Sequence, residues 1–271
     1  MSDTVETIYD FDELKMYFGE DYWVTDKICI HQPKIGDILE FGDTKFYTMV
    51  NTFCSNPTTY RLQLWEKGID WNKISDYSLF CLLIKGFTPK ETSLLFGGIN
   101  FSQFELMHDN VSNSEILINI SRDENGNMIP VNYEDAIIID EFVYTKLVKY
   151  LRVMFNIQPK IEHAKNKATK EAMIWEDEMN KKLEHDKKKQ EDIPKSYLLP
   201  LVSALVNHPG FKYKTNELKD IGIVQFMDSV KRLQVYENTT ALLKGMYSGM
   251  IDVKNINKKD LNWLKDLNLF V

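Results

Sequence analysis

An acidic pair after an apolar run is the part of the sequence that most closely has the form of a reaction centre. Residues 136–141 read Ala-Ile-Ile-Ile-Asp-Glu, the form of a Walker B strand, whose terminal acids would hold magnesium and polarise water. This chemistry also requires a phosphate-binding loop, G-x-x-x-x-G-K-[ST], and the sequence contains no such string. We therefore interpret residues 136–139 as a β-strand that runs into a helix capped by Asp140.

The histidines and cysteines are dispersed along the chain. They are His31, His108, His163, His185 and His208, and Cys29, Cys54 and Cys81. They form no H-x-x-x-H or C-x-x-C spacing, so a zinc knuckle and a disulfide framework are not predicted. A metal site or a Ser–His–acid triad assembled from distant residues stays open, although no G-x-S-x-G elbow supports a triad. The sequence thus predicts no catalytic residue, no metal ligand and no cofactor.

Nucleic-acid binding is disfavoured. The net charge is -7, and phosphate neutralisation needs clustered lysine and arginine. Residues 217–232 have the outline of a helix-turn-helix with Gly222 in the turn, but apolar positions outnumber the polar ones that a recognition helix would need. We favour a buried core helix for this segment.

The composition is that of an ordinary globular protein. Hydrophobic residues make up 44% of the 271 and charged residues 27%. The N-terminus is acidic and polar, unlike a signal peptide, and no apolar run approaches the roughly 20 residues that span a bilayer. We expect an intracellular protein without membrane contact.

The pattern predicts an α+β fold in three parts: an α+β domain over residues 1–157, a charged helical connector over 158–192 and a helical domain over 193–271. In the first part, Asn125-Gly126 is a strong hairpin signal between two apolar runs. The expected elements there are a strand at 23–30, a helix at 35–53 that Gly42 interrupts, a helix from 75 to about 86, strands at 116–120, 128–131 and 136–139, and a helix from Asp140 to Phe155 that Pro159 ends.

The connector is marked by balanced charge. Residues 160–192 hold nine lysines and nine acidic side chains with few apolar ones. Such a segment is either a solvated helix supported by i,i+4 charge pairs or a disordered hinge. We favour a helix to about Glu184.

The C-terminal part is helical in pattern. A short apolar helix is expected at 196–206, and a long amphipathic stretch covers Ile223–Gly249. Ala241, Gly245 and Gly249 fall four residues apart within it, which predicts one close-packed helix edge. With exposed aromatic residues elsewhere, they make the set of interface candidates: Trp23, Trp65, Trp71, Ala241, Gly245, Gly249, Trp263 and Phe270.

Several longer strings resemble proteins encoded in phages and prophages of low-GC Gram-positive bacteria, in structural and tail-morphogenesis regions. The strings are residues 32–43, 68–76, 85–89, 195–213, 226–236, 240–252 and 258–263. The resemblance covers most of the chain except 160–192. The family has no catalytic motif to transfer, so no site residue is carried over.

The resemblance implies a non-enzymatic phage structural or assembly protein: a head–tail or tail component, or a tail assembly chaperone. Its partners would be other phage structural proteins or further copies of this chain, and it would act in the host cytoplasm during assembly or in the virion. The alternative is an intracellular phage protein that inhibits a host factor or contacts nucleic acid. The presence of the protein in purified virions at stoichiometric copy number would separate the two.

Overall fold

The computed structural model describes residues 11–110, 113–122, 128–129, 134–188, 196–251, 254 and 256–264. The chain is 57% helical with small antiparallel sheets, which confirms the α+β prediction. The described α-helices are α1 (Glu13–Tyr17), α2 (Ile35–Phe41), α3 (Asp43–Cys54), α4 (Arg61–Glu66), α5 (Asp76–Leu83), α6 (Pro89–Phe96), α7 (Glu141–Met154), α8 (Lys167–Lys188), α9 (Leu198–Asn207) and α10 (Ile223–Tyr247). Short 3-10 turns are η1 (Ile84–Gly86), η2 (Phe101–Gln103), η3 (Glu217–Asp220) and η5 (Lys258–Leu261).

The strands form three small antiparallel sheets. β1 (Tyr22–Trp23) pairs with β2 (Cys29–Ile30), and β5 (Ser121–Arg122) with β6 (Met128–Ile129). The third sheet has the order β3-β4-β7, from Phe104–Asp109, Ser114–Asn119 and Ile138–Ile139. The predicted Asn125-Gly126 turn lies outside the described residues. β5 pairs with β6 on its two sides, but the strand expected at 116–120 pairs instead with β3, which was not predicted, and with β7.

Aromatic packing holds the N-terminal body together. Phe53 on α3 is fully buried, and its ring contacts the rings of Phe80, Phe87, Phe96 and Phe101 at centroid distances of 5.1–5.9 Å. These rings come from α5, α6 and the turns after them, so one side chain joins several elements. Such pairs add to area burial, at about 0.5–1.5 kcal/mol each.

Several helices begin directly after a residue whose side chain caps the first turn. The Asp140 side chain accepts a hydrogen bond from Val143 N at 2.7 Å, so the Walker B-like acid serves as the cap of α7, as predicted. Ser75 caps α5 in the same way. Helix α6 was not predicted, although Thr88 and Glu91 form a capping box around Pro89 at its first position.

Two expected elements are corrected at their turns. The single strand expected at 23–30 is a hairpin, because the chain reverses after Trp23 and Val24 N donates to Ile28 O at 2.9 Å. The helix expected at 35–53 is two helices, since Gly42 adopts φ 97° between them. Only glycine takes that conformation readily. The helix predicted from Asp140 to Phe155 is confirmed as α7 with these two residues as its caps, but the left-handed Asn156 follows its end before Pro159 is reached.

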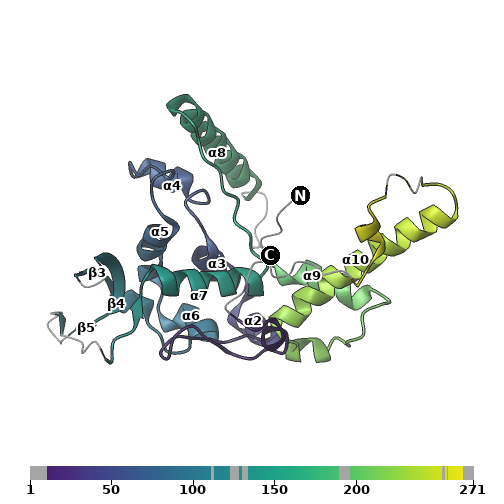
Figure 1. The fold of residues 1–271 in the computed structure, drawn as a ribbon, viewed down its shortest axis with the longest axis horizontal. Helices are drawn as coiled ribbons and strands as arrows, with labels where there is room; N and C mark the ends of the chain where they lie inside the picture. The colour runs from purple at the N-terminus through teal and green to yellow at the C-terminus, as the bar shows by residue number, and fades with distance from the viewer. Residues whose placement is uncertain are drawn as a thin grey trace.

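The charged connector is helical, as predicted, but it is not free of the body. Helix α8 projects from the body near α4 (Figure 1) and buries Ile174 against the α4 region. Arg61, the first residue of α4, makes ion pairs with Asp177 on α8 and with Glu162 just before it. Its Nη2 donates to Asp177 Oδ1 at 2.6 Å, and its side chain is only 11% exposed.

The C-terminal segment shares the core of the N-terminal body. Ile35 N donates to Ile221 O at 2.9 Å, and Ile223 N donates to Pro33 O at 3.1 Å. One buried apolar cluster contains residues of α2, α3 and α7 together with Leu198, Leu205, Leu218, Ile223 and Phe226. The division of the chain at residues 157 and 193 stays a prediction.

Candidate functional site

The end of α10 that lies away from the body is the candidate interaction site. Ile223 and Phe226 are fully buried, so the helix starts in the core and then runs outward (Figure 1). Towards its end, Tyr247 is 83% exposed and the following Met250 is 87% exposed. We call residues 234–251 and 256–264 the distal arm. Large apolar side chains exposed on an extended element are typical of a contact surface.

A second segment of the chain lies along α10 in the distal arm. Thr239 Oγ1 donates to Asp260 O at 3.0 Å, and Arg232 Nη1 donates to Trp263 O at 3.3 Å. The Trp263 ring meets Tyr236 edge-on at 5.8 Å. The described part of the C-terminal tail therefore folds back on this protein, while Trp263 remains 45% exposed.

The predicted small-residue edge is only partly a helix edge. Gly249 lies outside α10: it follows the C-cap Ser248 with φ 71°. Gly249 N donates to Met246 O at 3.1 Å and Met250 N to Gly245 O at 3.0 Å, which is the Schellman pattern. The left-handed conformation of this turn, and not close helix packing, accounts for Gly249.

Gly245 does meet a close neighbour, but the neighbour is a side chain. A Cβ atom at Gly245 would lie 2.4 Å from Ile251 Cδ1 and 2.9 Å from its Cγ1. Ile251 folds over the last turn of α10 because the Schellman turn reverses the chain. Ala241 is exposed beside a groove of about 450 Å³ that Val235, Thr239 and Ile251 also line.

Replacing Gly245 by leucine should destabilise the protein by about 1–2 kcal/mol, because overpacking against Ile251 outweighs the gain in helix propensity. Urea unfolding measures the change. The double variant Gly245→Leu/Ile251→Ala should recover stability relative to the sum of its single variants, since it removes the collision. Additive effects of the two substitutions would show that this contact does not restrict residue 245.

The tryptophan candidates divide by burial. Trp23 is 63% exposed on β1, and Trp65 is partly exposed on α4, so both remain surface candidates. Trp71 is only 2% exposed, because it packs with Ala164 and Ile174 beneath the connector. Trp71 therefore makes its contacts inside this molecule and not at the surface, where a partner was predicted to bind. Phe270 lies outside the described residues.

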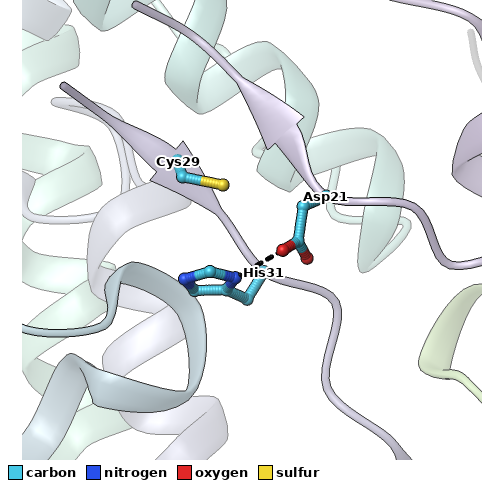
Figure 2. A group of neighbouring side chains, drawn as sticks. All are labelled: Asp21, Cys29 and His31. Atoms are coloured by element: carbon cyan, nitrogen blue, oxygen red, sulfur yellow. Dashed lines mark hydrogen bonds and ion pairs between the residues drawn. The ribbon is translucent and has the colours of Figure 1, made fainter. Parts of the chain in front are cut away.

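The structure gathers one set of possible metal ligands that the sequence did not reveal. Asp21, Cys29 and His31 each offer a ligand atom, and these atoms lie within 4.8 Å of one another (Figure 2). Asp21 Oδ2 and His31 Nδ1 are 2.8 Å apart. Burial, and then the charge of Asp21, raise the pKa of the Cys29 thiol. The visible sequence signal was the Cys-x-His alternation at 29–31, which is informative only once the hairpin register is known.

The apparent helix-turn-helix is a core element. η3 stands in place of its first helix, and Gly222 precedes α10. Ile223 and Phe226 are fully buried in the first turns of α10. The prediction that this segment starts a buried helix is confirmed.

A family model described as the YomV second domain matches residues 187–268. YomV is a protein of a Bacillus phage or prophage region, so the C-terminal segment is similar to a phage-associated domain. No curated protein and no solved structure matches the chain. Within the described residues, no helix is both long and apolar enough to cross a membrane.

Proposed function

We propose that this chain is a phage structural or assembly protein that works through protein–protein contacts of its distal arm. The proposed setting is the head–tail or tail apparatus, either as a virion component or as a chaperone of tail assembly. The partner is another phage structural protein or a second copy of the chain. The similarity of residues 187–268 to a phage-associated domain supports the setting.

One observation carries the proposal: α10 has a buried beginning and an apolar, exposed end. The first turns anchor the helix in the core through Ile223 and Phe226. Beyond them Tyr247 at the end of the helix and Met250 in the turn after it are exposed to solvent, with Leu264 exposed on the returning segment. Burial of an aromatic or large apolar side chain contributes roughly 1.5–3 kcal/mol, so a partner that covers these three gains substantial affinity.

Crosslinking in cells where the encoding phage is replicating tests the proposal. Lys258 and Lys259 are exposed on the distal arm, so an amine-reactive crosslinker should join them to the partner. We expect mass spectrometry to find crosslinks to phage structural proteins or between copies of this chain. The triple variant Tyr247→Ser/Met250→Ser/Leu264→Ser should reduce these crosslinks at least tenfold.

A matched triple variant on the body is the control. Leu39, Leu82 and Phe142 are also large and exposed, so Leu39→Ser/Leu82→Ser/Phe142→Ser removes similar apolar surface away from the distal arm. This variant should keep the crosslinks. Equal loss in both variants, or crosslinks to host proteins alone, would contradict the proposal, and the latter result would favour the host-factor alternative.

A further inference from the structure

The β1–β2 hairpin places an oxygen, a sulfur and a nitrogen donor at one point. The register pairs Tyr22 with Ile30 and Trp23 with Cys29. Continued by one residue, it sets Asp21 opposite His31. Cys29 and His31 are two positions apart and therefore share a face of the strand. Figure 2 shows the three side chains converging from the two arms of the hairpin.

Hydrogen bonds and ring stacking hold the backbone that carries these three side chains. Backbone His31 N donates to Leu95 O of α6 at 2.8 Å, and the Thr25 hydroxyl accepts from Ile28 N at 3.1 Å in the turn. Next to Asp21, the Tyr22 ring stacks on the buried Tyr150 at 4.4 Å. Ligands on a supported hairpin need little ordering to bind an ion.

We propose that Asp21, Cys29 and His31 bind a divalent transition-metal ion of the zinc class. Thiolate, imidazole and carboxylate are the ligands that zinc takes in proteins, and three of them with a water molecule complete a tetrahedral site. The proposal concerns the body of the protein and does not depend on the function of the distal arm.

The distances between the three ligand atoms are already close to those of an occupied zinc site. With Zn–N near 2.0 Å and Zn–S near 2.3 Å, tetrahedral ligand atoms lie about 3.3–3.7 Å apart. The three ligand atoms lie within 4.8 Å, so rotations that move them by about an ångström suffice. Asp21 and His31 are each nearly half exposed, which gives an ion access from solvent.

A nucleophilic role for Cys29 fits less well. A reactive cysteine sits beside positive charge that favours its thiolate. Cys29 is instead buried and faces the Asp21 carboxylate, and both features raise its pKa. A bound cation would reverse this balance, because it replaces the thiol proton and compensates the charge of Asp21.

Cobalt(II) titration of the full-length, tag-free protein tests the site. We expect one equivalent to bind, with a sulfur-to-cobalt charge-transfer band that one equivalent of zinc removes. Cys29→Ser should abolish the band, and Asp21→Asn and His31→Gln should each weaken binding at least tenfold. Circular dichroism verifies that each variant is folded.

His208 supplies the matched control. It pairs with Glu237 at 3.1 Å and so repeats the histidine–carboxylate pair, and no third ligand atom joins the two among the residues that the structure describes. His208→Gln should leave the cobalt spectrum unchanged. A wild-type protein without a charge-transfer band, or a band that survives Cys29→Ser, would overturn the proposal and leave Asp21 and His31 as a hydrogen-bonded pair across the hairpin.

Discussion

Replacing Arg61 by alanine should lower the free energy of unfolding by about 3 kcal/mol and release α8 from the body. Asp177 would then lose its cation while its side chain is only 23% exposed, whereas Glu162, 26% exposed, keeps its ion pair with Lys160. Leaving a partly buried carboxylate such as Asp177 unpaired costs more than the net value of the pair itself. Urea unfolding measures the stability, and hydrogen exchange over residues 167–183 reports the release of the helix.

Lys181→Ala is the control for this experiment. Lys181 also links α8 to the α4 region, through Glu66 at 3.6 Å, but these side chains are 63% and 55% exposed. Exposed pairs of this kind contribute about 0–1 kcal/mol. Equal, small effects of Arg61→Ala and Lys181→Ala would show that Arg61 is not needed to hold the connector, which also packs through Ile174 and pairs Lys170 with Asp70 at 2.5 Å.

The second large effect is expected at Gly36, where α2 meets the segment before α10. A Cβ atom at this position would lie 2.9 Å from Lys219 O and 3.2 Å from Lys219 Cβ. A backbone carbonyl cannot rotate away as a side chain does. Gly36→Val should therefore separate the two segments and lower the free energy of unfolding by about 2–3 kcal/mol.

Separation at Gly36 has a specific consequence that can be measured. The hydrogen bonds Ile35 N to Ile221 O and Ile223 N to Pro33 O lie next to the contact, both on the same side of it. Both amides should exchange faster in Gly36→Val. Gly86→Val is the control, because a Cβ atom at Gly86 meets no atom within 4 Å. Unchanged protection of Ile35 and Ile223 would contradict the close approach seen here.

Gly36 also bears on how the distal arm is held. The buried start of α10 follows directly after the Lys219 contact, so the N-terminal body fixes the direction in which the helix leaves the core. A variant that loosens this contact is expected to leave the apolar residues of the distal arm in place but less firmly oriented. Partner binding would then weaken without any change in the arm itself.

The sequence by itself determined those features whose partners are near in the chain. Asp140 caps α7 through a residue three positions away, and Ser75 does the same for α5. Balanced charge at 160–192 indicated a helix. Apolar residues that recur at helical spacing from Ile223 and Phe226 onward indicated a buried face. Local hydrogen bonds and periodicity suffice for these features, so they can be predicted without knowing the fold.

The tertiary structure decided which distant residues meet. As one extended strand, residues 21–31 would hold Asp21 about 30 Å from His31, whereas the turn after Trp23 brings them into contact. Arg61 likewise finds its partners 101 and 116 residues along the chain. A pattern of small residues such as Ala241, Gly245 and Gly249 does not distinguish helix packing from a left-handed turn. These outcomes depend on chain reversals and on packing summed over the whole core, which no short stretch of sequence specifies.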